Sequence, residues 1–181
     1  MTAGTALEPE RIRILNAQPE RDGRYVLYWM QQSQRTRENP ALELAVQRAN
    51  ALGLPVVVGF GLTADYPEAN ARHYRFMLEG LADVAGRLAG RGIPFVLRRG
   101  SPPAVALELA REAAAVVCDR GYLRHQKAWR ETLAREAGCR VAQVEGDVVV
   151  PVDAVTAKRE YAARTLRPKI GRLRDGYLRE L

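Results

Sequence analysis

The feature that most constrains the fold of this chain is an alternation of short apolar runs with longer amphipathic stretches. Each run contains branched or aromatic side chains and ends at a glycine or a polar residue, which is typical of a strand buried on both faces. Between the runs, apolar residues recur at the spacing of one face of a helix. The expected strands span residues 25–30, 56–60, 93–97, 114–118 and 140–144.

This alternation predicts an α/β fold. Strands joined by helical crossovers lie parallel, and the crossovers are right-handed. We therefore expect a Rossmann-like, doubly wound sheet of about five parallel strands with helices on both faces. The strand order is expected to reverse beside the first strand, between it and the fourth. Ligands of such sheets bind at the carboxyl ends of the strands, near the reversal.

Local signals place the helices between these strands. Asn39 can cap the amides of a helix that begins at Pro40, and Gly53 supplies its end. Ser101 is the expected cap of a later helix. The long helix before residue 90 is expected to turn an apolar stripe inward, formed by Tyr74, Met77, Leu78, Leu81, Val84 and Leu88.

The chain divides into three expected parts: an N-terminal arm (1–24), the α/β domain (25–147) and a basic tail (148–181). The tail is interpreted as an extended linker, then a turn or helix, and a last helical pattern opened by Pro168, with Ile170, Leu173, Tyr177, Leu178 and Leu181 on one side. Nothing in the sequence covers that apolar side, so a second domain is expected to follow.

Most of the positive charge lies in the tail. The net charge is +7, and residues 157–181 hold eight basic residues, among them Arg159 and Arg179, against three acidic ones. The domain itself is therefore nearly neutral and is not expected to bind many phosphates alone.

No apolar stretch reaches the length of roughly 18 residues needed to span a membrane, and the N-terminus lacks the apolar core of a signal peptide. We expect a cytoplasmic protein that does not contact membranes. Cys118 and Cys139 are expected to be buried free thiols, because no Cys/His cluster at metal-ligand spacing accompanies them.

The carboxyl ends of the expected strands bring together residues 31–35, 61–65, 98–101, 119–122 and 145–147. Asp119 is the most informative acid, since a carboxylate at the end of a buried strand needs a donor. That donor could be a backbone amide, an arginine such as Arg120, or a ligand; alternatively Asp119 caps the helix from Tyr122 onward. Trp29 is interpreted mainly as a core residue, with a place beside a stacked ring as the alternative.

Other motifs are not supported by their context. Gly59, Gly61 and Ala64 match the spacing of a dinucleotide fingerprint, but a polar turn stands where the helix should begin. No P-loop is present. His73 and His125 lie on expected helices without a nucleophile beside them, so no catalytic residue and no metal ligand is predicted.

Six separated segments carry a family resemblance: YVLYWMQQSQR, NPALELAVQRANALGLPVVVGFGLTADYPEANARHYRFMLEGL, FVLRRGSPPAVALELA, VVCDRGYLRHQKAWR, VEGDVVVPV and EYAARTLRPKI. Together, in this order, they resemble the N-terminal domain of class II cyclobutane pyrimidine dimer photolyases, over roughly residues 11–171. In that family a helical domain follows, which binds FAD and damaged DNA and repairs the dimer in light.

The resemblance implies a scaffold and antenna role without catalysis by this chain alone. FAD would be bound only by the helical domain, which would dock through residues 148–181 and make the contact with DNA. The chain itself would hold an antenna chromophore, a deazaflavin or a folate. The implied pigment contacts are Trp29, Met30, Gln31, Gln32, Ser33, Gly61, Asp119, Arg120, Tyr122, Glu145 and Asp147.

Two alternatives stay open. One is a stand-alone nucleotide-binding domain related to universal stress proteins, which would bind ATP or AMP rather than a pigment. The other is a purely structural role with an empty strand edge.

Overall fold

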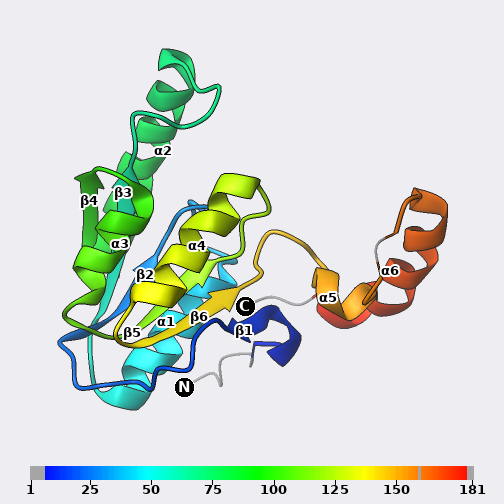
Figure 1. Ribbon diagram of the computed structural model, residues 1–181, viewed down its shortest axis with the longest axis horizontal. Helices are drawn as coiled ribbons and strands as arrows, with labels where there is room; N and C mark the ends of the chain where they lie inside the picture. Colours follow the sequence, from blue (N-terminus) through cyan, green and yellow to red (C-terminus); the bar gives the residue numbers. More distant parts are fainter. Residues whose placement is uncertain (1–6, 159, 179–181) are drawn as a thin grey trace.

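The computed structural model describes residues 7–158 and 160–178. A six-stranded sheet in the order β1-β6-β5-β2-β3-β4 forms its centre (Figure 1). The strands are β1 (Ile12–Ile14), β2 (Tyr25–Trp29), β3 (Val56–Leu62), β4 (Phe95–Arg99), β5 (Ala113–Asp119) and β6 (Arg140–Val144). The helices are η1 (Pro9–Arg11), α1 (Pro40–Leu52), α2 (Ala71–Ala89), α3 (Pro102–Ala110), α4 (Arg124–Glu136), α5 (Val152–Val155) and α6 (Ala163–Tyr177).

The predicted doubly wound sheet is confirmed. Strands β2 to β6 are mutually parallel where they pair, and β2 lies between β3 and β5. The chain order therefore reverses between β2 and β5, which is the predicted position. The sequence analysis missed β1, which pairs antiparallel with β6, with Ile12 opposite Val144. A strand of three residues has too little apolar alternation to be recognised in a sequence.

The side chains of β2 divide the core into two halves. Val26, Tyr28 and Met30 point to one face and pack with residues of α1 and α2. Leu27 and Trp29 point to the other face and pack with residues of α3 and α4. All five side chains are at most 2% exposed, so the strand is covered on both faces as predicted.

The local helix signals act largely as expected. The Asn39 side chain accepts hydrogen bonds from the amides of Ala41 and Leu42, both at 3.1 Å. Gly53 ends α1 in the left-handed region, with φ of 65°. Ser101 occupies the N-cap position of α3, but its side chain makes no capping hydrogen bond. Cys118 and Cys139 are buried and free.

Helix α2 is only half embedded in the core. Its buried residues are Leu81, Val84 and Leu88, all in its second half. The first half rises past the end of the sheet (Figure 1), where Phe76 is 81% exposed. Leu78, expected in the buried stripe, is exposed for the same reason: no strand lies beneath this part of the helix.

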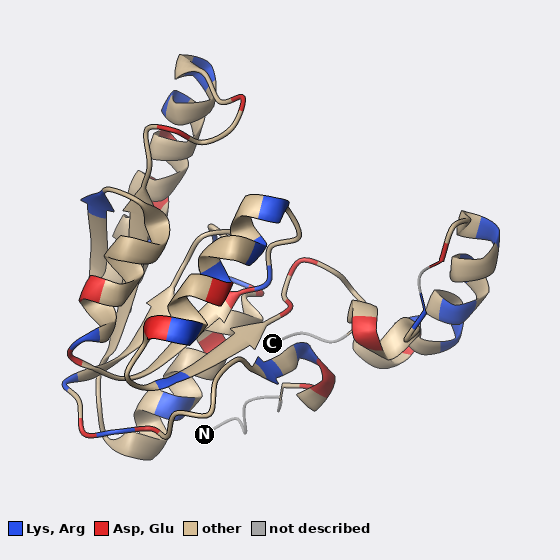
Figure 2. Cartoon of the chain, viewed as in Figure 1, with Lys and Arg blue, Asp and Glu red and all other residues tan. Residues whose placement is uncertain are grey.

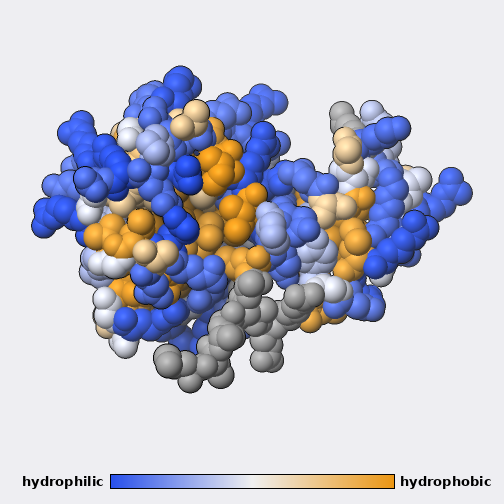
Figure 3. All heavy atoms as spheres, turned by 90° about the horizontal axis from the view of Figure 1, so that it is seen from below, coloured by the Kyte–Doolittle hydropathy of each residue, from blue (hydrophilic) through white to orange (hydrophobic). Residues whose placement is uncertain are grey.

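The C-terminal tail is helical over more of its length than the sequence suggested. Helix α5 occupies part of the expected linker, and α6 begins at Ala163, so Pro168 lies inside the helix and does not open it. No residue of α6 is buried. Figure 2 shows lysine and arginine along α6, and Figure 3 shows apolar surface on the same segment. The expected stripe residue Leu181, together with Arg159, Arg179 and Glu180, lies outside the described residues.

Within the described ranges, no helix combines the length and the apolar composition needed to cross a lipid bilayer.

One glycine is required by the close approach of two chain segments. A Cβ atom on Gly23 would lie 2.3 Å from the backbone nitrogen of Ala114, at the start of β5. We expect Gly23→Ala to lower the free energy of unfolding by about 1–3 kcal/mol, because backbone atoms would have to move apart. Gly86→Ala is the matched control, since a Cβ atom there meets nothing within 4 Å. The control should raise stability by about 0.5–1 kcal/mol, as expected for glycine replaced in a helix. Urea unfolding curves that shift equally for both variants would contradict this account.

Candidate functional site

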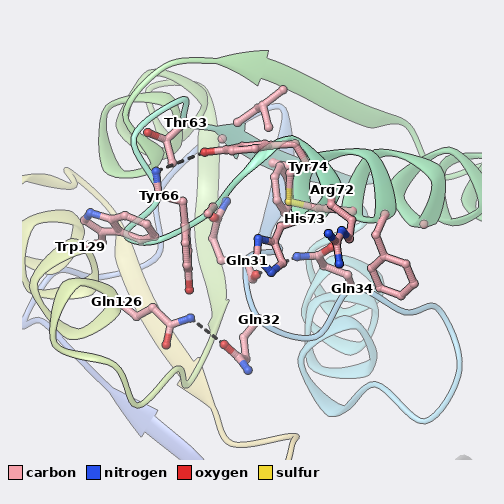
Figure 4. A pocket seen from close by; sticks show the side chains of 17 residues that line it. Gln31, Gln32, Gln34, Thr63, Tyr66, Arg72, His73, Tyr74, Gln126 and Trp129 are labelled. Carbon is pink, nitrogen blue, oxygen red and sulfur yellow. Dashed lines mark hydrogen bonds between the residues drawn. The ribbon is translucent and has the colours of Figure 1, made fainter.

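A cavity of about 730 Å³ lies at the carboxyl ends of β2 and β3, between α2 and α4 (Figure 4). Side chains from four parts of the chain line it: Gln31, Gln32 and Gln34 after β2; Phe60, Gly61, Leu62, Thr63, Tyr66 and Ala69 on β3 and the following loop; Arg72, His73, Tyr74, Phe76, Met77 and Gly80 on α2; Gln126 and Trp129 on α4. The cavity is thus next to the predicted reversal of the sheet, where α/β domains hold ligands.

Aromatic rings form one side of the cavity. The ring centroids of Tyr66 and His125 lie 4.8 Å apart, and those of His125 and Trp129 lie 4.9 Å apart. Tyr66 and Trp129 meet at 6.2 Å with an interplanar angle of 68°. The backbone amide of Tyr66 donates to the Tyr74 hydroxyl at 3.2 Å, which ties this loop to α2. The rings of Tyr66 and Trp129 offer flat apolar surface to a ligand.

Amide side chains form the floor. Gln126 Nε2 donates to Gln32 Oε1 at 2.7 Å, so α4 is joined to the loop after β2. Gln34 Nε2 donates to the backbone carbonyl of Gln31 at 3.3 Å. The Gln31 Nε2 atom is buried and has no hydrogen-bond partner in residues 7–158 and 160–178. A buried donor without a partner is costly, and a ligand acceptor in the cavity would satisfy it.

Asp119 holds the loop that carries these glutamines. Its Oδ2 atom accepts hydrogen bonds from the backbone amides of Gln31, Gln32 and Ser33, at 2.9, 2.9 and 3.1 Å. Its Oδ1 atom accepts from the Tyr28 hydroxyl at 2.8 Å. Burial raises the pKa of Asp119, and the hydrogen bonds from the loop amides and Tyr28 oppose that rise. The sequence left open which donors would bind Asp119, and in the structure these include the backbone amides of the loop.

Two of the other roles considered for Asp119, pairing with Arg120 and capping of α4, are not observed among the described residues. Its carboxylate does not pair with Arg120, whose guanidinium bonds elsewhere. It does not cap α4, because that helix begins at Arg124 and the amide of Leu123 donates to the Gln126 side chain at 3.1 Å.

The structure divides the predicted pigment contacts into three groups. Gln31, Gln32 and Gly61 line the cavity. Trp29 and Met30 lie in the core, on opposite faces of the sheet, and neither reaches the cavity. The remaining residues do not line the cavity, and other protein groups bind their side chains; they are Ser33, Asp119, Arg120, Tyr122, Glu145 and Asp147.

Ser33 and Asp147 form one of these polar groups. The Ser33 hydroxyl donates to Asp147 Oδ1 at 2.7 Å, and Arg35 Nη1 donates to the same atom at 2.9 Å. Burial raises the pKa of Asp147, but the hydrogen bonds from Ser33 and Arg35 together have a larger effect, so the pKa of Asp147 lies below its usual value.

Glu145 is the centre of the second polar group and is 1% exposed. It accepts hydrogen bonds from the Tyr122 hydroxyl, from Arg120 Nη1 at 3.1 Å and from the backbone amide of Val152 at 3.1 Å. Arg120 also donates to Asp153 at 2.7 Å. Burial raises the pKa of Tyr122, and its hydrogen bond to Glu145 raises it further. The bonds to Val152 and Asp153 attach the tail to the sheet.

Arg11 makes a further attachment of the tail and is 7% exposed. Its guanidinium donates to the backbone carbonyls of Glu145, Val148 and Val149, at 3.1, 2.9 and 2.6 Å. It also lies 5.4 Å from the centroid of the Tyr177 ring on α6, within the range of a cation–π contact. The N-terminal segment thus fixes both the start and the end of the tail.

The sequence analysis missed the cavity walls that come from helices. Arg72, Gln126 and Trp129 were not among the predicted contacts, although all three line the cavity. Trp129 also packs partly against the core. The sequence signal for these walls was a cluster of polar and aromatic residues in the first half of α2 and of α4. Such a cluster is also typical of an ordinary solvent-exposed helix surface.

A doubly wound sheet with an aromatic-lined cavity at its reversal is the arrangement of α/β domains that hold a ligand at the strand ends. The family model described as DNA photolyase matches residues 26–181. The chain belongs to the DNA photolyase family.

A curated relative agrees with this assignment, and two solved structures share the fold. A deoxyribodipyrimidine photo-lyase of Methanothermobacter thermautotrophicus is 51% identical over 167 residues, which are 92% of this chain and 38% of the relative. The class III photolyase of Agrobacterium tumefaciens superposes with a TM-score of 0.66 at 20% identity, covering 94% of this chain and 34% of that one. The photolyase of Sulfolobus tokodaii, solved with two FAD molecules, superposes with a TM-score of 0.70 at 14% identity. The superposition covers 81% of this chain and 34% of that one. The chain therefore spans about a third of the length of these proteins.

We expect Asp119→Asn to lower the free energy of unfolding by about 1.5–3 kcal/mol, because an amide group replaces one of the two oxygens that accept hydrogen bonds from buried donors. The loop amides of residues 31–33 should also exchange hydrogen faster than in the parent. Asp65→Asn is the matched control, since Asp65 is exposed and its side chain does not contact this loop. Equal unfolding midpoints for the two variants in urea would show that Asp119 does not hold the loop.

We expect Arg11→Lys to release the tail, because an ammonium group cannot reach three carbonyls in the way that a planar guanidinium does. Hydrogen exchange at residues 148–155 should accelerate by at least about tenfold, the effect of losing one or two buried hydrogen bonds. Arg13→Lys, on the exposed part of β1, provides the control. Unchanged exchange in Arg11→Lys would mean that α5 is held without Arg11.

Proposed function

We propose that this chain is the antenna and scaffold domain of a class II cyclobutane pyrimidine dimer photolyase. It supports light-driven, FAD-dependent repair of DNA and does not catalyse repair alone. The class II assignment rests on the resemblance of six sequence segments, and the antenna role rests on the cavity beside β2 and β3. A cytoplasmic location stays a prediction from the sequence.

The cavity is the observation that carries this proposal. Its volume of about 730 Å³ lies in the range of roughly 300–1,000 Å³ that is usual for small-molecule sites. Tyr66 and Trp129 offer faces for a planar ring, and Gln31 offers a buried donor without a partner in the described part of the chain. These residues fit a deazaflavin or a folate. Such a pigment, when bound, absorbs near-ultraviolet or blue light and passes the energy to FAD.

The tail is proposed as the connection to the helical FAD-binding domain. Residues 25–147 are the α/β domain in this proposal, and residues 148–181 are the linker and the beginning of its docking surface. Helix α6 has no buried residue, and its apolar side is available for that domain. DNA would be contacted through the helical domain.

A stand-alone nucleotide-binding domain of the universal stress type is the alternative, and the extent of the family match argues against it. The match to the photolyase family extends to residue 181 and includes the whole tail. Binding of ATP or AMP in place of a pigment would support this alternative.

The first experiment measures pigment binding by the purified chain. An 8-hydroxydeazaflavin and a methenyltetrahydrofolate are each titrated while their fluorescence anisotropy is recorded. We expect one of them to bind, and Trp129→Ala to weaken its binding about tenfold through loss of a stacking surface. Trp129→Phe should recover part of this loss.

Tyr161→Ala is the control, because Tyr161 is exposed and lies outside the cavity. The antenna role is wrong if neither pigment binds, or if the Trp129 and Tyr161 variants lose affinity equally. Mixing the chain with a helical FAD-binding domain tests the scaffold role separately. That mixture should associate and restore light-dependent repair of dimers.

A further inference from the structure

The side chains that line the cavity carry positive charge on one side only, and the rest of the lining is uncharged. Among the residues that the structure describes, its lining contains no aspartate and no glutamate, and Arg72 is its one arginine. Figure 4 shows Arg72, His73 and Gln34 on the side opposite Tyr66 and Trp129, with Gln31 between the two sides. The cavity therefore has an aromatic end and a basic end.

Arg72 has no acidic partner in the parts of the chain that the structure describes. On the same helix, Arg75 pairs with Glu79 at 3.0 Å and Arg87 pairs with Asp83 at 2.7 Å, both at the i, i+4 spacing. The residue four positions after Arg72 is Phe76, which cannot pair with it. The guanidinium at the cavity is thus left with its donors available to an incoming group.

His73 adds a second donor at the same end. Its Nδ1 atom accepts a hydrogen bond from the backbone amide of Asn70 at 3.1 Å, so the neutral ring carries its proton on Nε2. The Asn70 side chain in turn accepts from the backbone amides of Arg72 and His73. The helix amides are already used by this cap, and the side chains of Arg72 and His73 are the groups left to bind a ligand.

We infer that the cavity selects a pigment with an anionic substituent, a phosphate or a carboxylate, which binds Arg72 and His73 while the heteroaromatic ring lies against Tyr66 and Trp129. This inference rests on the proposed antenna function and adds the charge of the ligand and its orientation. Charge-assisted hydrogen bonds from a guanidinium to a phosphate or a carboxylate are stronger than those between neutral groups. A pigment without the anionic group would lose these contacts and bind more weakly.

Riboflavin and flavin mononucleotide provide a matched pair of probes, because they share one ring system and side chain and differ only in a terminal phosphate. Each is titrated into the purified chain, and the dissociation constant is obtained from flavin fluorescence anisotropy. We expect the phosphate to improve affinity by at least about tenfold at low salt. The improvement should shrink as salt concentration rises.

Variants of α2 locate the source of the preference. Arg72→Gln should reduce the ratio of the two dissociation constants to about one, with little effect on riboflavin, whereas Arg72→Lys should keep part of the preference. Arg75→Gln removes an equal charge one turn away that is already paired and does not line the cavity, so it should leave the ratio unchanged.

The outcomes separate this inference from the function on which it rests. If neither flavin binds, the inferred preference for an anionic flavin-like ligand is wrong, whereas the antenna role is decided separately by the titrations with the deazaflavin and the folate. If both bind with equal affinity, the ligand site stands and the anionic preference is wrong. If Arg75→Gln lowers the preference as much as Arg72→Gln, the effect is the general positive charge of the surface, and the assignment to Arg72 is overturned.

Discussion

The contact between the Asp119 carboxylate and the backbone amides of residues 31–33 is the interaction on which the rest of the site depends. It joins the ends of β5 and β2, the two central strands between which the chain order reverses. A turn that leaves a buried strand exposes several amides without partners, and one buried carboxylate satisfies three of them here. Because Gln31 and Gln32 belong to this turn, the position of the cavity floor is set by Asp119, which does not itself line the cavity.

The fold was predictable because its determinants are local and repeated. Branched and aromatic runs such as that of β2, and helix signals such as Asn39 and Gly53, act within a few residues. The reversal between β2 and β5 follows from general rules for doubly wound sheets. Strand β1 was not predictable, because its pairing partner lies more than a hundred residues away and three residues are too few to establish a period.

The site was only partly predictable, because the carboxyl edge of a sheet has two sides. Of the predicted pigment contacts, Gln31, Gln32 and Gly61 line the cavity. Arg120 and Glu145 instead bind Asp153 and Val152 of the tail, and Tyr122 binds Glu145. The position of a residue at the end of a predicted strand shows that it lies at the carboxyl edge of the sheet. It does not show which helix packs over that part of the edge. The need of Asp119 for a donor was evident from the sequence, but the identity of that donor depends on which strand lies next to β5.

The attachment made by Arg11 has a consequence for how two domains would exchange energy. A single guanidinium on the N-terminal segment sets where the polypeptide leaves the sheet and, through Tyr177, how α6 is oriented. Under the proposed function, the transfer of excitation from a pigment to a flavin depends steeply on their separation and on the angle between their transition dipoles. A side chain that does not line the cavity would therefore tune the efficiency of light harvesting without altering the colour of the light absorbed.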